Sequence, residues 1–402
     1  MRVLLSTIGS RGDVQPLVAL GLQLKVLGQE VHLCVPPDFR EWIEGLGMTV
    51  TPIGPELRST GKASPSAVPT PDQRRQMIES TVTTQFETIM SAAEGCDSIV
   101  GATALQIAAP SVAEKLGIPY VFAAYCPAVL PSPHHAPPVL VALGDKPTTQ
   151  PNYGELWEQD AQRWNEAWGA LLNSHREKLG LARVADVRSH ILTDRPWLAA
   201  DPTLGPWPDP DDGAVFQTGA WILKDDRALS SELEAFLEAG EPPIYFGFGS
   251  IRAPENLSQV MIQTARALGR RAILLRGWAD LSLVDDQPDC TAIGEVNQQA
   301  LFKRVATVVH HGGAGTTTAA ARAGAPQVLI PQHYDQHYWA GRVQQLGIGT
   351  AHAASTPTAD SLTSALEQTL QPDVAARSHA IATAVRSDGA LVAAQCLIDV
   401  AA

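Results

Sequence analysis

The first half of the chain alternates short apolar runs with longer stretches whose apolar side chains recur at helical spacing. Residues 3–8 form an apolar run of β type, and residues 14–27, after a polar turn, show a helical pattern that tolerates Pro16 in its first turn. Further strands are predicted at 31–35, 48–53, 98–100 and 120–124, and a helix near 108–116. Strands that alternate with helices predict a parallel sheet with helices on both faces.

A second series of the same kind follows residues 201–213, where four prolines and several acidic residues exclude a regular element. Its strands are predicted at 244–248, 272–275, 291–293, 306–309 and 327–330, and its helices near 255–268, 297–303, 315–323 and 336–346. The expected organisation is α/β, with a first domain over 1–200, a Pro-rich linker over 201–219 and a second domain over 220–385. The last helical run, within 386–402, could pack on either half.

A Pro-rich stretch over 126–151 interrupts the first series and carries seven prolines. A loop of this length inside a compact domain is usually functional, so contact with a substrate is one interpretation of its doublet, His134 and His135. A plain exposed loop is the other. The next segment, 153–179, is predicted to be helical, and its tryptophans at 157, 164 and 168 recur near helical spacing, which favours core packing.

Charge and composition exclude several classes of protein. The 402 residues include 29 Lys and Arg against 42 Asp and Glu, a net charge of −13, which argues against a nucleic-acid partner or an anionic membrane surface. No run of eighteen apolar residues is present and the first apolar run stops at Ile8, so neither a membrane span nor a signal peptide is expected. The five scattered cysteines indicate reduced thiols in a cytoplasmic protein. We expect the protein to be a monomer or a weak dimer.

The strongest local signal is the run His-His-Gly-Gly-Ala-Gly-Thr-Thr-Thr at 310–318, which follows a predicted strand and opens an Ala-rich helix. Small residues let the backbone approach a ligand closely, and the free N–H groups of a helix start favour an anion. His311 adds a donor, and Thr316 and Thr317 add hydroxyls, so the run is interpreted as a cradle for a diphosphate. The alternative is a glycine-rich turn that serves only the packing of helix on sheet.

Polar residues follow other predicted strands at the same edge of the sheets. Residues 246–250, Phe-Gly-Phe-Gly-Ser, place glycine and hydroxyl where ligands bind in α/β folds, although a plain turn would have the same composition. After the strand at 327–330, Asp335 and Gln336 could bond sugar hydroxyls. The alternatives are a helix cap at Asp335, or a metal site that joins Asp335 to His333 and His337, together with His310 or His311.

The turn after the first predicted strand holds Arg11 and Asp13. A carboxylate at the edge of a sheet that faces a cleft between domains is a candidate general base. Capping of the following helix is the more common role of such an aspartate. Both interpretations of Asp13 stay open at this point.

Together these residues resemble the GT-B glycosyltransferases of family 1, and more narrowly the actinobacterial enzymes that glycosylate antibiotics of the vancomycin type. The shared motifs cover nearly the whole chain and lie at residues 9–16, 219–223, 248–250, 276–280, 294–298 and 310–343. Sterol and lipid glucosyltransferases share the motifs at 11–16 and 310–317, so they remain an alternative, as do macrolide and polyketide enzymes.

The resemblance implies two Rossmann-like domains whose parallel sheets face a central cleft, with an acceptor on the first half and a nucleotide-sugar on the second. It implies that Asp13 is the catalytic base, although many relatives use a histidine in this turn, and that Asp335 and Gln336 contact the donor hexose. The positions that match nucleotide and diphosphate contacts are Arg11, Ser250, Trp278, Val296, His311, Gly313, Gly315 and Thr316. The resemblance implies neither a metal nor a cofactor.

Two departures from plant relatives bear on the donor. Glu295 stands where they place a tryptophan that stacks on uracil, and Ala319 stands where they place a glutamate that clamps the ribose. A missing clamp tolerates deoxyribose, so a dTDP-sugar is favoured over a UDP-sugar. The expected activity is inverting hexosyl transfer to a hydroxyl of a natural-product aglycone, with a glycopeptide antibiotic favoured. A nucleotide-sugar epimerase or hydrolase, and a nucleotide-sugar-sensing module, are the rival classes.

Overall fold

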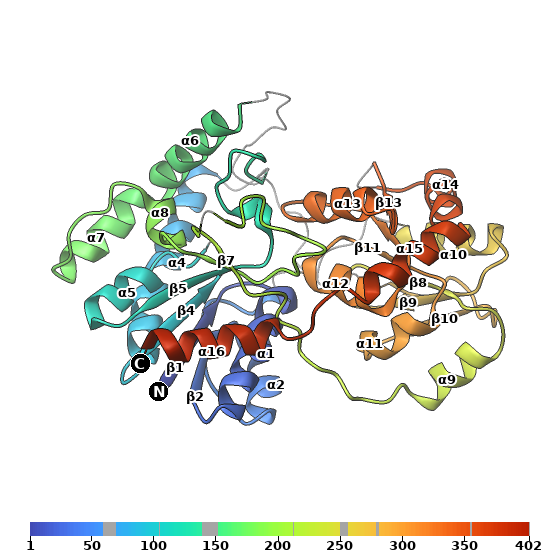
Figure 1. The fold of residues 1–402 in the computed structure, drawn as a ribbon, viewed down its shortest axis with the longest axis horizontal. Coiled ribbons are helices and arrows are strands. Elements are labelled where there is room, and N and C mark those ends of the chain that lie inside the picture. Colours follow the sequence, from blue (N-terminus) through green and yellow to red (C-terminus); the bar gives the residue numbers. More distant parts are fainter. Residues whose placement is uncertain are drawn as a thin grey trace.

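The β-strands of the chain assemble into two separate sheets, one in each half (Figure 1). This computed structural model describes residues 1–58, 70–103, 105–138, 152–211, 213–249, 256–278, 281–353 and 356–401. The strand pairings within these ranges are parallel, and an apolar core lies on each face of each sheet. The predicted α/β architecture is confirmed.

The first sheet has the strand order β3-β2-β1-β4-β5-β6-β7. Its strands are β1 (Arg2–Thr7), β2 (Glu30–Val35), β3 (Thr49–Pro52), β4 (Ser98–Ala102), β5 (Tyr120–Ala124), β6 (Trp197–Leu198) and β7 (Phe216–Gln217). Successive residues of a strand point to opposite faces, so Leu4 joins the core on one face while Val3 and Leu5 join the core on the other. All three are fully buried, as a sheet covered on both faces requires.

Helices of the first half pack on both faces of this sheet (Figure 1). They are α1 (Arg11–Val26), α2 (Arg40–Gly45), α4 (Pro71–Ala92), α5 (Ala109–Leu116), α6 (Tyr153–Trp164), α7 (Ala170–Lys178) and α8 (Val187–Leu192), with short helical turns η1 (Pro37–Phe39), η2 (Pro127–Val129) and η4 (Asn165–Gly169). The helix predicted at 153–179 is the run α6, η4 and α7, in which η4 is a π-helical turn. Trp164 and Trp168 pack in the core as predicted. Trp157 is buried outside that core, and both Trp157 and Trp164 line a pocket.

The second sheet has the order β10-β9-β8-β11-β12-β13. Its strands are β8 (Ile244–Gly247), β9 (Ala272–Leu275), β10 (Cys290–Ile293), β11 (Thr307–His310), β12 (Gln327–Leu329) and β13 (Gly349–Ala351). Its helices are α9 (Ser231–Glu238), α10 (Leu257–Ala267), α11 (Gln298–Leu301), α12 (Ala314–Ala323), α13 (Gln336–Gln345), α14 (Ala359–Thr369) and α15 (Pro372–Ala382), with the turn η5 (Phe302–Arg304). Each sheet reverses its strand order beside its own first strand, and ligands of such folds bind at the carboxyl ends of the strands at that point.

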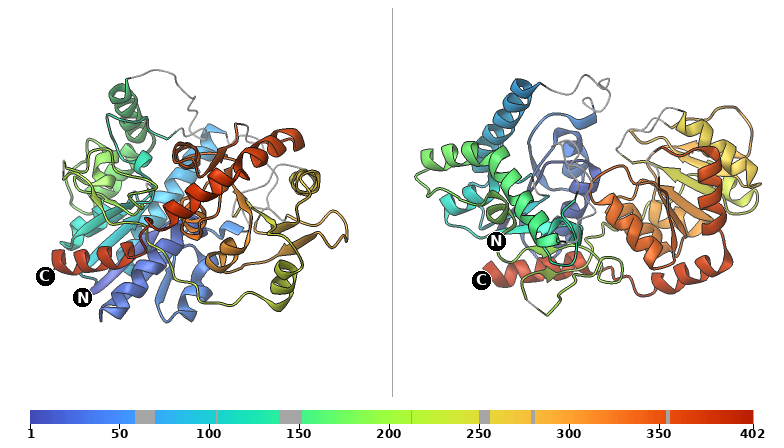
Figure 2. Two further views of the ribbon diagram at one scale, coloured as in Figure 1. Left: turned by 45° about the vertical axis from the view of Figure 1, so that its right-hand side comes forward. Right: turned by 90° about the horizontal axis from the view of Figure 1, so that it is seen from above.

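The chain passes between the halves twice, after β7 and again before α16 (Gly389–Ala401). The two crossing segments touch, since a Cβ added to Gly389 would lie 2.4 Å from the carbonyl carbon of Gly219. Helix α16 then packs against α1 through Ala393 and Leu397, so both chain ends lie on the first half (Figure 2). The linker expected at 201–219 is not free of the sheets, because β7 forms an edge strand of the first one; the expected domain boundaries stay predictions.

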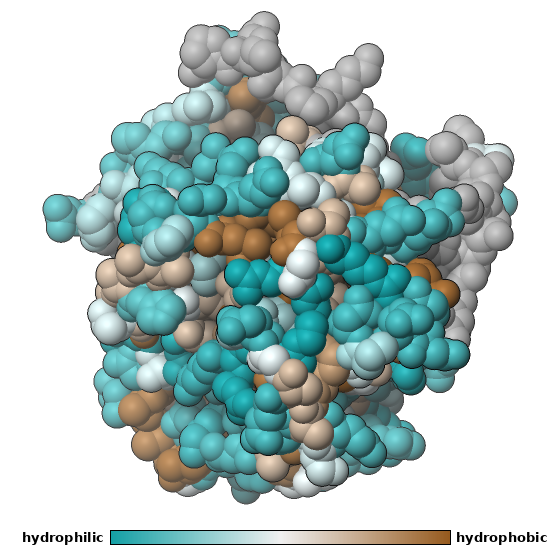
Figure 3. Space-filling model, turned by 90° about the vertical axis from the view of Figure 1, so that its right-hand side faces the viewer, coloured by the Kyte–Doolittle hydropathy of each residue, from teal (hydrophilic) through white to brown (hydrophobic). Residues whose placement is uncertain are grey.

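The outer face of the second half is mostly hydrophilic, with apolar side chains in small separate groups (Figure 3). That composition is typical of a surface exposed to water. Within the described ranges every helix is too short or too polar to serve as a membrane span. All five cysteines are unpaired, and four of them are buried.

Candidate active site

The predicted site residues gather where the carboxyl edges of the two sheets meet. On the first half, β1 ends at Thr7 and α1 begins at Arg11. On the second half, β11 ends at His310 and α12 begins at Ala314. The halves approach closely here, because a guanidinium nitrogen of Arg11 lies 3.7 Å from a carboxylate oxygen of Glu295.

Asp13 occupies the first turn of α1 and closes a capping box with Ser10. Its Oδ2 accepts hydrogen bonds from the Ser10 backbone N–H at 2.7 Å and from the Ser10 hydroxyl at 3.3 Å. Gly9 makes room for this carboxylate, since a Cβ there would lie 2.2 Å from Oδ2. Burial raises the pKa of Asp13 to about 6, against the opposing effect of the Ser10 hydrogen bonds. Asp13 therefore caps the start of α1 in part, and its carboxyl group titrates close to neutral pH.

Asp335 stands directly before α13 and faces the same region from the second half. Its Oδ2 accepts a hydrogen bond from the indole N–H of Trp339 at 3.1 Å. Burial raises the pKa of Asp335 to about 7, and the nearby charge of Asp13 adds to this rise. Because the charge of Asp13 acts on Asp335, the two carboxyl groups lie near each other across the gap between the halves.

Gln336 contributes to the shape of the loop before α13. Its side-chain oxygen accepts hydrogen bonds from the backbone N–H groups of Gln332 at 2.8 Å and His333 at 3.2 Å. The carboxamide oxygen is thus engaged within the loop, while the amide nitrogen is the end that matches a donor to a sugar hydroxyl. Among the described residues, no three His, Cys, Asp or Glu side chains gather as a metal-binding group, so the metal alternative for this loop has no geometric support.

The glycine-rich run after β11 is held in place by His310. The fully buried His310 accepts the N–H of Gly312 at Nδ1, at 3.1 Å, and its Nε2 lies 3.0 Å from the side-chain oxygen of Gln327. Gly312 has a φ of +94°, a conformation that favours glycine. This turn directs the start of α12 toward the cleft.

The start of α12 has the free backbone N–H groups that the predicted anion site requires, and the site itself stays a prediction. The first backbone N–H groups of a helix have no partner within it, and here they belong to Ala314, Gly315 and Thr316. The Thr317 hydroxyl donates back to the carbonyl of Gly313 at 2.9 Å and is nearly fully buried. Of the two hydroxyls considered from sequence, only that of Thr316 is therefore placed to meet a ligand.

His311 lies between two glycines. A Cβ on Gly313 would stand 2.6 Å from its Nε2, and one on Gly249 would stand 3.1 Å from its Cε1, so larger residues at either position would displace the imidazole. Burial lowers the pKa of His311 to about 4, so the ring is neutral at physiological pH. Its Nδ1 is buried, and a hydrogen bond with the backbone of Gly247 opposes part of this fall in pKa.

The other residues that were predicted to contact the nucleotide differ in what they pack against. The backbone N–H of Trp278 donates to the carbonyl of Gly249 at 3.0 Å, and the indole of Trp278 packs beside the core of the first half. Val296 packs against the core of the second half. Arg11 stacks on the Trp42 ring at 3.8 Å, so its charge is already placed between the halves. Ser250 lies outside the described residues.

The loop that carries His134 and His135 is anchored rather than free. The His134 ring lies 2.9 Å from a carboxylate oxygen of Asp209, and the indole of Trp157 donates to the carbonyl of His135 at 2.9 Å. Neither imidazole lines the pocket found nearby. The contact with an acceptor that was expected of this loop stays a prediction.

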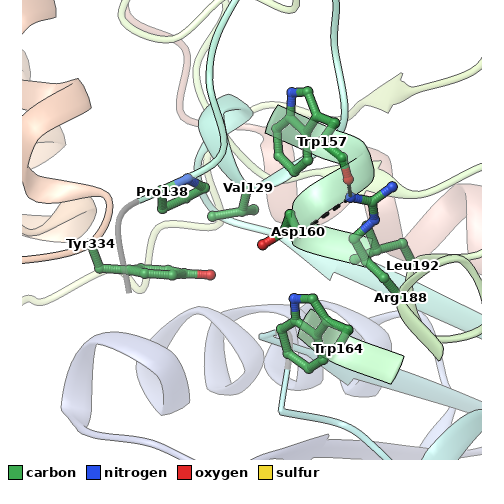
Figure 4. Close-up of a pocket in the computed structure, with 8 residues that line it drawn as sticks. All are labelled: Val129, Pro138, Trp157, Asp160, Trp164, Arg188, Leu192 and Tyr334. Carbon is green, nitrogen blue, oxygen red and sulfur yellow. Dashed lines mark hydrogen bonds and ion pairs between the residues drawn. The ribbon is translucent and has the colours of Figure 1, made fainter. Parts of the chain in front are cut away.

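That pocket combines aromatic walls with charge, and Figure 4 shows its residues. They are Val129, Pro138, Trp157, Asp160, Trp164, Arg188, Leu192 and Tyr334. The sequence patterns did not single out Asp160, Arg188 or Tyr334, which come together only in the folded chain. One signal was present: Asp160 follows Trp157 by three positions and precedes Trp164 by four, so it interrupts an apolar helix face.

Comparisons with known proteins identify the family. The glycosyltransferase family 28 N-terminal domain matches residues 3–132, and the C-terminal domain described as erythromycin biosynthesis protein CIII-like matches residues 273–393. The vancomycin aglycone glucosyltransferase of Amycolatopsis orientalis is 52% identical over 404 residues, which cover 99% of this chain and 97% of that relative. The chain belongs to the vancomycin-type glycosyltransferases.

One further relative and one solved structure are similar to this chain. The dTDP-epi-vancosaminyltransferase of Amycolatopsis orientalis is 42% identical to this glycosyltransferase over 95% of its chain and 93% of the relative. The crystal structure of glycosyltransferase VinC in complex with dTDP superposes with a TM-score of 0.69 at 20% identity, covering 100% of this chain and 99% of that one. The glycosyltransferase therefore has the GT-B fold that its sequence predicted, and it is an enzyme.

Proposed function

We propose that this glycosyltransferase moves a hexose from a dTDP- or UDP-sugar to a hydroxyl of a natural-product aglycone, with a glycopeptide aglycone as the favoured acceptor. The observation that carries the proposal is the meeting of Asp13, on the first half, with Asp335 and the start of α12 on the second. A base, a sugar-binding carboxylate and an anion site then surround one cleft. The names of the 52% and 42% identical relatives, a vancomycin aglycone glucosyltransferase and a dTDP-epi-vancosaminyltransferase, support the choice of acceptor class.

The chemistry follows from what these groups can do. Asp13 takes the proton of the acceptor hydroxyl while its oxygen forms a bond to the anomeric carbon of the sugar. The bond from that carbon to the diphosphate oxygen breaks on the opposite face, so the configuration inverts. Base assistance of this kind is typically worth ~10²–10⁴-fold in rate. With a pKa of about 6, Asp13 is mostly ionised at pH 7 and is basic enough to accept a proton.

The leaving group gains its stabilisation from the second half. Negative charge grows on the diphosphate as the bond breaks, and the N–H groups of Gly315 and Thr316 with neutral His311 are arranged to donate to it. Because these donors are fixed before the reaction, no metal is required in this proposal. Asp335 would bond hydroxyls of the hexose, together with the amide nitrogen of Gln336.

The nucleotide is proposed from the residues that could contact a ribose. Ala319 is partly buried, packs beside the core of the second half and offers no hydrogen-bonding group. A site without such a group does not distinguish ribose from deoxyribose. We therefore favour dTDP-sugars, and the similarity to the dTDP-epi-vancosaminyltransferase supports the same class of donor.

A panel of donors and acceptors tests the proposal. Purified protein is incubated with dTDP-glucose, dTDP-vancosamine or UDP-glucose, each with vancomycin aglycone, a macrolide aglycone or a sterol, and products are read by mass spectrometry. We expect the mass of one sugar residue added to the glycopeptide. Rapid donor hydrolysis or epimerisation in the absence of any acceptor, without transfer, would instead support the rival enzyme class.

A further inference from the structure

Helix α13 of the second half packs against residues 201–207 of the first half, which we call the docking loop and which lie between strands β6 and β7. The guanidinium of Arg342 in α13 donates to the backbone carbonyls of Leu204 at 2.8 Å and of Thr203 at 3.3 Å. Figure 1 shows α13 on the side of the second half that faces the first. Because α13 begins directly after Asp335, the proposed sugar contact lies at one end of this junction between the halves.

Trp339 fills the junction with its ring, three positions before Arg342 on α13. The side chain is only 1% exposed and belongs to one apolar cluster with Leu204 and Trp207 of the docking loop. Gly205 lets the loop approach the ring closely, since a Cβ there would lie 2.9 Å from Cη2 and 3.2 Å from Cζ3 of Trp339. Both atoms belong to the six-membered ring of the indole, so the first half fixes the position of that ring.

The five-membered ring of the same indole holds Asp335. Its N–H donates to Oδ2 of Asp335 at 3.1 Å. Burial raises the pKa of Asp335 to about 7, and the hydrogen bond from Trp339 is the strongest of the effects that oppose this rise. The bond therefore stabilises the charged carboxylate and restricts the directions in which it can point. One side chain thus connects the docking loop to the carboxylate.

We infer that Trp339 is a positioning residue, which orients the Asp335 carboxylate for the donor sugar while Gly205 of the first half fixes the place of Trp339. This inference rests on the proposed function, in which Asp335 bonds hydroxyls of the hexose. Trp339 acts through Asp335 and not on the substrates themselves. The grip of the second half on the sugar then depends on its contact with the first half.

Trp339→Phe tests the hydrogen bond, with Trp207→Phe as a matched control. Trp207 lies in the same apolar cluster, and its buried indole N–H has no hydrogen-bond partner among the described residues, so only Trp339→Phe removes a bond to Asp335. Initial rates are measured with vancomycin aglycone and the best donor of the panel. Loss of a hydrogen bond to a charged group should lower kcat/KM for the donor about tenfold, against less than about threefold in the control. The acceptor KM, and the affinity for the free nucleoside diphosphate of that donor, should change less than about twofold.

A double variant separates positioning from a merely structural role. In an Asp335→Ala background, Trp339→Phe should change kcat/KM less than about twofold, because the interaction that it removes is already absent. An indole that served only the packing of α13 would instead lower kcat/KM by the same factor in both backgrounds.

Gly205→Ala tests the connection to the first half. Gly205 does not have a positive φ, so alanine suits its backbone, whereas the new Cβ would displace the ring of Trp339. Gly341→Ala is the matched control, because Gly341 lies in α13 itself and a Cβ there would meet no atom within 4 Å. We expect Gly205→Ala to lower kcat/KM for the donor at least about threefold, and Gly341→Ala to leave it within about twofold of the wild type.

Four results would overturn the inference. They are equal losses in Trp339→Phe and Trp207→Phe, a loss that persists in the Asp335→Ala background, equal weakening of the free nucleoside diphosphate, and equal activity of Gly205→Ala and Gly341→Ala. If the wild type transferred sugar to no acceptor, the proposed function would fail, and calorimetry with dTDP-glucose and dTDP would still decide the role of Trp339. A fall of about tenfold in the ratio of the two affinities in Trp339→Phe supports that role, and an unchanged ratio refutes it.

Discussion

Asp13→Asn separates the two interpretations of Asp13, general base and helix cap. Burial raises the pKa of this carboxyl from its ordinary value of 3.8 to about 6, so keeping it ionised in the folded protein costs about 3 kcal/mol above pH 6. Asparagine keeps an oxygen that can accept the Ser10 N–H, although as a weaker acceptor. We therefore expect a net gain in the free energy of unfolding of about 2 kcal/mol at pH 8.

The direction in which stability changes with pH follows from the protons bound at Asp13. Between about pH 4 and pH 6 the folded protein binds more protons at Asp13 than the unfolded chain does, so stability falls as pH rises through this window and stays lower above it. The asparagine variant lacks this fall. At pH 8 it should melt about 4–8 °C above the wild type, if the first half unfolds as one unit.

The transferase activity of Asp13→Asn should fall, although its stability rises. The variant should lose ~10²–10⁴-fold in kcat for transfer, and wild-type kcat/KM should fall about tenfold for each pH unit below 6. Melting is followed by differential scanning fluorimetry from pH 5 to 8, and transfer by mass spectrometry of the product. A variant that melts below the wild type at pH 8 and transfers sugar at a near-normal rate would show that Asp13 serves as a cap and not as the base.

Three further predictions concern residues of the second half that surround the proposed donor site. In Gly313→Ala the new Cβ would stand 2.6 Å from Nε2 of His311, so UDP and dTDP should bind at least about tenfold more weakly by calorimetry; unchanged affinity would remove His311 from the cradle. Because burial lowers the pKa of His311 to about 4, nucleotide affinity should vary less than about twofold between pH 6 and 8 apart from titration of the phosphate, and a loss of affinity centred near pH 6.5 would indicate a charged imidazole. Asp335→Asn should lower kcat/KM about tenfold or more while free UDP binds as before, and equal weakening of UDP would place Asp335 at the nucleotide instead of the hexose.

Much of the fold could be predicted because buried strands and their helices leave strong periodic signals. Strands β5 and β9 have the bounds that the apolar runs predict, and α13 ends within one residue of its prediction. Helix α4 was not predicted, since most of its 22 residues are polar, and its buried apolar side chains are confined to Val82, Phe86, Ile89 and Ala92 in its second half. The last two strands of the first sheet, β6 and β7, have two residues each, too few for a period-two pattern to be seen.

Some features of the site follow from the local sequence, and others depend on contacts between residues that are far apart in the chain. Asp13, His311 and Asp335 lie in turns at the ends of predicted strands, so their common edge could be predicted from chain order alone. The engagement of Gln336 with its own loop and of Thr317 with Gly313 depends on side-chain geometry that motif spacing does not contain. The pocket around Asp160 could not be predicted, because Tyr334 reaches it from the other half of the molecule.

The anomeric configuration of the product tests the central claim most directly. The enzyme is supplied with an α-linked nucleotide-glucose and vancomycin aglycone, and the purified product is examined by proton NMR. The account predicts a single β-linked glucoside, formed with release of one nucleoside diphosphate for each sugar transferred, by wild type and not by Asp13→Asn. An α-linked product, or release of free glucose with the aglycone unchanged, would contradict it.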